Sequence, residues 1–115
     1  MGLLNLTLIK ENVSDEPEFI TELLEVFKLD VFTDFQALQK SIQKSDYIGI
    51  RTDAHKVKSS LRSLGVEECW TRLQEIEDLG ASGSEIERIN VLSNEINKLL
   101  PRLKEEVDAY LKTPY

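Results

Sequence analysis

The sequence predicts an all-α protein, an up-down-up-down antiparallel four-helix bundle with a short extra N-terminal helix. Apolar residues recur at three- and four-residue spacing along almost the whole chain, and no segment alternates strictly between apolar and polar. Helix-start and helix-stop signals divide the chain into four long helices joined by short turns, which is the pattern of an antiparallel bundle. The chain has 115 residues, of which 41% are apolar. This is enough for one hydrophobic core, so we expect a single domain over residues 1–115.

The first two predicted helices precede residue 45. A short helix is expected over residues 3–10. The segment SDEPE indicates the start of a long second helix, in which Asp15 is the cap, Pro17 lies in the first turn and Glu18 completes a capping box. This helix is expected to run to about Lys44. Its apolar stripe, which should face the core, consists of Ile20, Leu24, Phe27, Val31, Phe35, Leu38 and Ile42.

Two shorter helices are expected next. Asp46 is placed to cap the third helix, which should end at Gly65. The fourth should end in the segment LGASG, where we expect Gly80 to form the left-handed cap. The core-facing residues of the third helix are Ile50, Ala54, Val57, Leu61 and Leu64, and those of the fourth are Val66, Cys69, Leu73 and Ile76.

A long last helix completes the predicted bundle. The segment SEIE, which begins at Ser84, reads as a capping box that opens this helix. Pro101 is expected to kink or divide it, because proline removes a backbone donor from the helix interior. The predicted core stripe consists of Ile89, Ile96, Leu100, Leu103, Val107 and Tyr110.

Charge and composition argue against several classes of function. The net charge of -7 disfavours nucleic acid and anionic membrane surfaces as partners. One cysteine, Cys69, and one histidine do not supply the three or four ligands of a typical zinc site, so we expect no metal site. The N-terminal stretch LLNLTLI is too short and too polar to span a bilayer, and no basic signal-peptide start precedes it. We therefore expect a cytoplasmic protein with no membrane partner.

The only histidine, His55, lies among basic residues in the segment AHKVKSSLRSLG. At about 100° per residue, His55 points about 140° away from the core-facing direction of the third helix, so we expect an exposed imidazole. Arg51, His55, Lys58 and Arg62 are spaced four, three and four, which predicts a basic stripe on the exposed side. Over residues 51–62, four basic residues against one acidic residue give a local charge of +3.

A lone surface histidine commonly has no role, but the neighbours of His55 suit a nucleophile that accepts an anionic group. Flanking cations disfavour the protonated ring and leave a lone pair free. A phosphoryl group on the ring would bring negative charge, which Lys58, one turn further on, is placed to neutralise. Ser59 is small enough for a partner to approach, and its hydroxyl is able to donate a hydrogen bond.

The segment HKVKSSLRSLG resembles the signature of histidine phosphotransfer (HPt) domains. In that signature a lysine lies three positions after the histidine, a small residue comes next, and a glycine lies ten positions after the histidine. His55, Lys58, Ser59 and Gly65 occupy these places. VEECWTRLQEIE is similar to the next helix of the family, and the resemblance covers nearly the whole chain. The family commonly has glycine where this chain has Ser59, which bears on how closely a partner fits.

The resemblance implies a phosphorelay intermediate of two-component signalling, a phosphoryl carrier whose catalysis is largely supplied by its partner. His55 would accept a phosphoryl group from a receiver-domain aspartate and pass it to another receiver aspartate. The receivers would belong to response regulators or to a hybrid sensor histidine kinase. Lys58 and Ser59 would stabilise the phosphoryl group, and Gly65 would be structural. Mg²⁺ is expected on the receiver only, so we expect no cofactor on this chain, and we expect a monomer.

The residues that contact the receiver are expected to include Arg51 and Arg62, whose charge would attract an acidic receiver pocket. Phe32 lies out of phase with the core stripe of the second helix, which makes it a candidate apolar contact.

Two other functions compete with the phosphorelay. The phosphoacceptor part of a histidine kinase typically has an acidic residue directly after its histidine and a proline several positions later. This chain has Lys56 there, no proline between Pro17 and Pro101, and no ATP-binding domain, so we reject that class. A non-phosphorylated four-helix adaptor that binds a receiver or another signalling protein remains the alternative. The sequence permits either a free-standing protein or a segment of a hybrid kinase.

Overall fold

The structure, a computed structural model, describes residues 2–112. Within this range the chain forms a short helix, α1 (Leu6–Asn12), and four long ones, α2 (Pro17–Gln43), α3 (Tyr47–Ser63), α4 (Glu67–Ser82) and α5 (Ile86–Lys112). All regular secondary structure in these residues is helical, so the predicted all-α fold class is confirmed.

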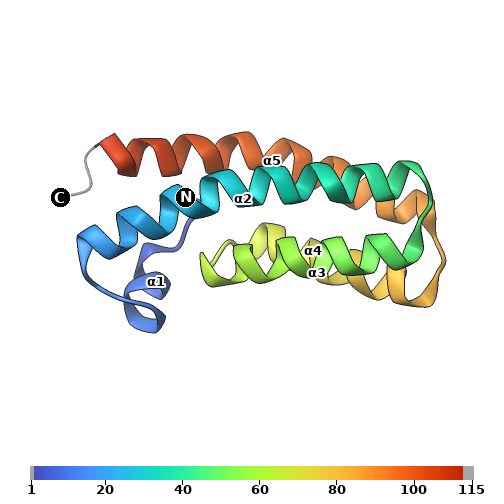
Figure 1. Ribbon diagram of the computed structural model, residues 1–115, viewed down its shortest axis with the longest axis horizontal. Helices are drawn as coiled ribbons and strands as arrows, with labels where there is room; N and C mark the ends of the chain where they lie inside the picture. The colour runs from blue at the N-terminus through green and yellow to red at the C-terminus, as the bar shows by residue number, and fades with distance from the viewer. Residues whose placement is uncertain (1, 113–115) are drawn as a thin grey trace.

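The four long helices lie side by side in a bundle (Figure 1). From α2 to α5, successive helices run in opposite directions along the long axis. Helix α3 packs against α2 and α4, and α5 packs against the same two helices. Helices α2 and α5 have 27 residues each, whereas α3 has 17 and α4 has 16. At about 1.5 Å per residue the longer pair extends beyond the shorter pair, and α1 lies at that end (Figure 1).

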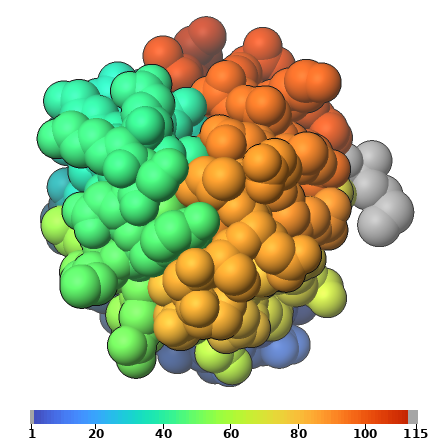
Figure 2. Space-filling model, turned by 90° about the vertical axis from the view of Figure 1, so that its right-hand side faces the viewer, coloured from blue at the N-terminus to red at the C-terminus, as the bar shows by residue number. Residues whose placement is uncertain are grey.

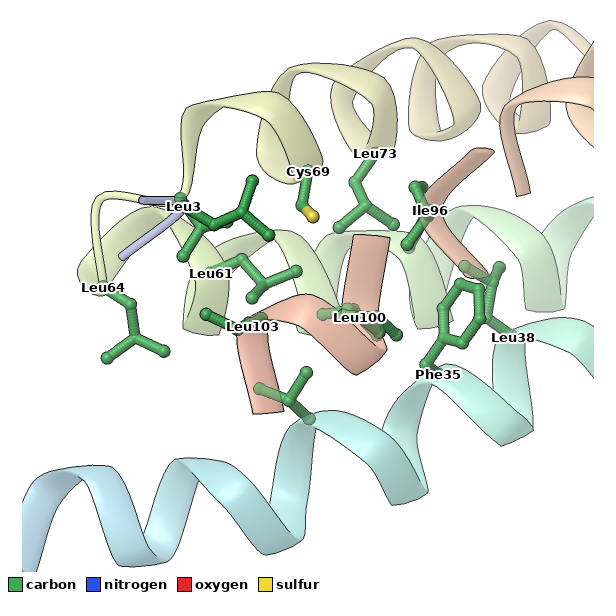
Figure 3. Close-up of a cluster of buried hydrophobic side chains, with 14 of the residues drawn as sticks. Leu3, Phe35, Leu38, Leu61, Leu64, Cys69, Leu73, Ile96, Leu100 and Leu103 are labelled. Carbon is green, nitrogen blue, oxygen red and sulfur yellow. The ribbon is translucent and has the colours of Figure 1, made fainter. Parts of the chain in front are cut away.

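The hydrophobic core lies between the four long helices. Figure 3 shows Phe35 of α2, Leu61 of α3 and Leu100 of α5 within one cluster of buried side chains. The predicted core stripes of all four helices are buried, except that Phe27 and Tyr110 are half-buried. The three- and four-residue spacing in the sequence therefore identified the correct face of each long helix.

The helix starts follow the predicted signals only in part. Asp46 caps α3 as expected, because its Oδ1 accepts a hydrogen bond from the backbone N–H of Gly49 at 3.1 Å. The expected cap of α2 is wrong. Glu16, and not Asp15, occupies the cap position without a side-chain capping bond, and Pro17 holds the first helical position. A proline there already has a backbone φ suited to a helix, so the helix starts at Pro17 without a side-chain cap.

The N-terminal helix begins later than predicted, at Leu6. Asn5 caps it, with its Oδ1 accepting from the N–H of Leu8 at 3.0 Å. The preceding N–H groups of Leu3 and Leu4 donate instead to the carboxylate of Glu106 on α5, at distances of 2.8 and 2.9 Å. This contact with the last helix holds the segment before α1 out of the helix.

In the second half of the chain the predicted left-handed cap of α4 is wrong, and the division of the last helix that Pro101 could have caused does not occur. The left-handed cap after α4 is Gly83, with φ +67°, whereas Gly80 is buried inside the helix. The hydroxyl of Ser84 forms a hydrogen bond with that of Ser82 at 3.1 Å, and α5 starts two residues after Ser84. Pro101 lies inside α5 and does not divide it. Pro101 is exposed, so it lies on the solvent side of α5.

Gly65, predicted to be structural, joins α3 to α4. Its φ of +70° lies in the left-handed region that side chains with a Cβ rarely adopt. A Cβ at this position would also come within 2.7 Å of the Cβ of Asn5. The chain is close there because the N–H of Asn5 donates to the carbonyl of Leu64 at 3.2 Å. These two constraints give the predicted role of Gly65 a physical basis.

Three further observations concern membranes, metals and the cysteine. Among the helices described, none combines the length and the apolar character that a membrane span needs. Residues 2–112 contain no group of three or more His, Cys, Asp or Glu side chains placed to share a metal ion. Cys69 is buried, and burial raises the pKa of its thiol to about 12, in keeping with the expectation that it packs as a small apolar residue.

Candidate functional site

His55 projects from the middle of α3 into solvent. Its side chain is 62% exposed, which confirms the orientation expected from the helical geometry. One turn away on the same face lie Thr52 and Ser59, both exposed, so small side chains flank the ring along the helix. The imidazole is therefore accessible to another protein while its backbone is held in a regular helix.

Lys58 does not belong to the exposed stripe, so this expectation is wrong. The residue is only 8% exposed. At about 100° per residue it lies about 80° from the core-facing direction of α3, at the edge of the buried face, and α4 covers that edge. Its ammonium group donates to Oε1 of Gln74 at 3.0 Å and pairs with Oε1 of Glu77 at 2.9 Å. The buried cation thus has two partners on the neighbouring helix.

Glu77 is the site residue that the sequence did not reveal. The same oxygen, Oε1, that pairs with Lys58 lies 3.1 Å from Nδ1 of His55. Gln74 and Glu77 are spaced three apart on α4, so they share the helix face that packs against α3. That spacing was the only available signal. It could have been used only with the register of α4 against α3, which the sequence does not give.

The electrostatics of Glu77 keep it ionised. Burial raises the pKa of the carboxyl, but hydrogen bonds from Lys58 and from His55, together with their charges, outweigh that effect and leave the pKa below its ordinary value. An ionised carboxylate only accepts hydrogen bonds, so Nδ1 of His55 must carry the hydrogen in their contact. In the neutral ring the lone pair then lies on Nε2. The contact with Glu77 therefore leaves the free lone pair of the neutral ring on one nitrogen, Nε2.

The hydroxyl of Ser59 is engaged with its own helix. It donates to the backbone carbonyl of His55, one turn earlier, at 2.9 Å. To donate to a group on the imidazole, the hydroxyl would have to leave that carbonyl and rotate. In the present arrangement Ser59 contributes its small size next to the ring.

The basic residues around His55 are more nearly neutralised than the sequence suggested. Lys56 pairs with Asp34 of α2 at 3.2 Å, and Lys58 pairs with Glu77. The local charge of +3 is thus offset by carboxylates from the two neighbouring helices, which a count along one helix cannot include. Arg51 and Arg62 are exposed, as expected.

Arg62 has an aromatic neighbour. Its guanidinium carbon lies 5.2 Å from the ring centroid of Trp70 on α4, within range of a cation–π contact. Trp70 is half-buried and packs against the core. The contact restricts the Arg62 side chain, so it presents its charge in a defined place two turns after His55.

Phe32 lies apart from His55. It is half-buried and packs against the core. It lines shallow hollows together with Leu103 and Pro101 of α5, whereas His55 contacts Glu77 of α4. Phe32 therefore lies on the side of α2 that faces α5. The structure does not bring it together with the imidazole. Its role as a partner contact stays a prediction.

Comparison with known proteins places this site in a family. No curated protein and no solved structure matches the chain. The family model of the Hpt domain matches residues 22–112, which include α3, α4, α5 and most of α2. Hpt domains carry phosphoryl groups in two-component phosphorelays and interact with receiver domains. Because the match covers most of its length, including His55 and Glu77, the chain belongs to the Hpt domain family.

Proposed function

We propose that this protein is a phosphorelay intermediate in which His55 takes a phosphoryl group from the aspartate of one receiver domain and transfers it to the aspartate of another. The observation that carries the proposal is the exposed imidazole whose Nδ1 faces the carboxylate of Glu77 at 3.1 Å. This arrangement leaves Nε2 with a lone pair directed away from the neighbouring helix. In its family, a nucleophile of this kind is the group that carries phosphate.

The proposed loading step balances without a cofactor on this chain. The Nε2 lone pair forms a bond to the phosphorus of the aspartyl phosphate while the bond from phosphorus to the aspartate oxygen breaks. The electron pair of that bond leaves with the aspartate carboxylate. The imidazole then carries a positive charge with its hydrogen still on Nδ1, and the carboxylate of Glu77 stabilises that charge. Unloading to the second receiver is the reverse of this step.

Lys58 acts in this proposal first as a positioning residue. Its ammonium holds the Glu77 oxygen that contacts His55, at 2.9 Å, and it is held in turn by Gln74. It stabilises the phosphoryl group directly only if it leaves that carboxylate when the group arrives. Ser59 permits close approach by its small size. Mg²⁺ is expected to be bound by the partner receiver, where it would neutralise charge on the phosphoryl oxygens.

Partner recognition is assigned to the exposed charges beside the nucleophile. Arg51 and Arg62 lie one and two turns from His55 and are exposed, so they are available to an acidic receiver surface. Since the bundle packs its four long helices within one chain, we expect it to act as a monomer. We also expect it to work in the cytoplasm.

Transfer from a phosphorylated receiver tests the proposal. The protein is incubated with radiolabelled phospho-receivers from the same cell, and we expect acid-labile, alkali-stable label on the wild type. His55→Ala should abolish the label, since it removes the nucleophile. Val91→Ala, at an exposed position on α5, is the control and should be labelled like the wild type.

The other outcomes identify the competing functions. Label that persists in His55→Ala would refute the site. Label that appears from ATP without a receiver would indicate a kinase. Receiver binding without any label would favour the non-phosphorylated adaptor.

A further inference from the structure

A hollow on the surface of the molecule begins at the imidazole of His55. It has a volume of about 460 Å³ and lies between α3 and α4. One wall comes from α3 and the opposite wall from α4. The lining residues are Ile48, Arg51, Thr52 and His55 of α3, and Glu77, Gly80 and Ala81 of α4. Because Ile48 is in the first turn of α3 and Ala81 in the last turn of α4, the hollow extends from His55 toward one end of the bundle. Figure 2 views that end, where the α2–α3 connection in green lies against the α4–α5 connection in orange.

The small residues of α4 account for the shape of the hollow. A Cβ on Gly80 would lie 3.0 Å from the backbone nitrogen and 3.2 Å from the Cα of Arg51, so the glycine allows α4 to approach α3 closely. Ala81, next to it, is exposed and has only a methyl group. On the α4 side the hollow is therefore bounded by Glu77 beside the imidazole and, further along the helix, by backbone and one methyl group.

Ile48 is an unusual wall for such a hollow. It is 82% exposed, more than any other large apolar side chain in residues 2–112. A single exposed isoleucine has no special meaning on a protein surface. Here it borders a hollow that also contains the nucleophile and the cation of Arg51. Burying this side chain in a complex would be favourable, because apolar area would be removed from water.

Geometry determines what would cover the hollow. For transfer to occur, the phosphorus must come within about 3–3.5 Å of Nε2. A specific protein interface covers about 800 Å² on each partner, so any receiver that reaches His55 covers well over one turn of helix around it. On the α2 side the adjacent surface is the ion pair of Lys56 and Asp34. On the α4 side it is the hollow with its exposed isoleucine and its arginine.

We infer that the hollow between α3 and α4 is the docking surface for a receiver domain. It receives an apolar side chain that the receiver carries beside its phosphorylated aspartate, with Ile48 buried against it and Arg51 facing the acidic receiver pocket. The inference rests on the proposed phosphorelay function and adds to it the side from which the partner approaches. The interface extends from His55 toward the start of α3 and the end of α4.

Two substitutions test this surface. Ile48→Ser removes the apolar wall without adding charge, and Ala81→Gln fills the hollow from its other side. Each should lower the second-order rate constant of transfer from the phospho-receiver that loads the wild type by about tenfold, through weaker docking. Ile48→Leu keeps an apolar wall and should stay within about twofold of the wild type. Val91→Ser, at an exposed position on α5, is the matched control and should leave the rate unchanged.

A second measurement separates docking from chemistry. Phosphoramidate, a small phosphodonor, should label His55 in all these variants at the rate of the wild type, because it needs no docking surface. Unchanged receiver transfer in both Ile48→Ser and Ala81→Gln would overturn the inference and leave the phosphorelay function intact. Failure of the wild type to accept phosphate from either donor would overturn the proposed function, and this inference with it.

Discussion

Among single residues, the carboxylate of Glu77 has the largest consequences for the site, because one of its oxygens serves two side chains. It holds Nδ1 of His55 at 3.1 Å and the buried ammonium of Lys58 at 2.9 Å. The sequence predicted the exposed imidazole correctly, because exposure follows from the helical periodicity of α3 alone. It did not predict Glu77, because a contact between α3 and α4 depends on how the two helices are aligned along their length.

Replacing Glu77 should weaken both the fold and the site. Glu77→Gln leaves the buried ammonium of Lys58 without its opposite charge, and we expect a loss of about 1–3 kcal/mol in the free energy of unfolding at pH 7. Phosphorylation of His55 should also slow, since the ring loses the carboxylate that fixes its tautomer. Urea denaturation measures the first effect and transfer kinetics the second. Glu75→Gln, which breaks a half-exposed pair with Arg88, is the matched control and should cost less than about 1 kcal/mol.

The effect of Glu77 on stability should depend on pH with a definite sign. The folded state lowers the pKa of this carboxyl from its ordinary value of 4.5, so folding favours the ionised form. The resulting stabilisation is fully present above pH 4.5 and is lost as the pH falls through the lower value of the folded state. The stability difference between the wild type and Glu77→Gln should therefore narrow on acidification. A difference that stays constant from pH 7 to pH 3 would contradict the assigned role.

At the scale of helices, the elements were predicted better than their ends. The core face of each long helix could be assigned from the sequence because burial repeats every three or four residues. The ends depend on contacts between distant segments. Leu3 and Leu4 donate to Glu106 of α5, which moves the start of α1, and the left-handed cap of α4 falls on Gly83 and not on Gly80. Periodicity along one helix contains no information about the contact with Glu106 or about which glycine takes the left-handed conformation.

Gly65 and Gly83 have similar positive φ angles. Comparing them separates the cost of a left-handed backbone from the cost of crowding by a new Cβ. Gly65→Ala and Gly83→Ala each place a Cβ in the left-handed region, with φ near +70° and +67° respectively, at an expected cost of about 1–2 kcal/mol. At Gly65 the new Cβ would also lie 2.7 Å from the Cβ of Asn5, whereas nothing lies within 4 Å of it at Gly83. Urea denaturation should thus show the larger loss for Gly65→Ala, and amide exchange in α1 should accelerate in that variant only. Equal losses with no change in α1 would mean that the contact with Asn5 does not constrain this turn.

At the scale of the whole molecule, the bundle provides a regular helical support for the exposed imidazole of His55 and surrounds it with charges from three helices. The fold class was predictable because helical periodicity and short connections allow few arrangements of four helices. The electrostatic surroundings of His55 were not, since Asp34 comes from α2 and Glu77 from α4. The basic segment around the histidine therefore pointed to an exposed imidazole and overstated the positive field around it.

We propose that the phosphoryl group is carried on Nε2 of His55 while Nδ1 is held by Glu77. The most direct measurement is a long-range ¹H–¹⁵N correlation spectrum of the imidazole, recorded after loading with a phospho-receiver, with coupling to ³¹P used to identify the modified nitrogen. We expect coupling at Nε2 and a hydrogen on Nδ1. Phosphorus coupled to Nδ1, or an unmodified imidazole in a protein that carries phosphate elsewhere, would contradict the account.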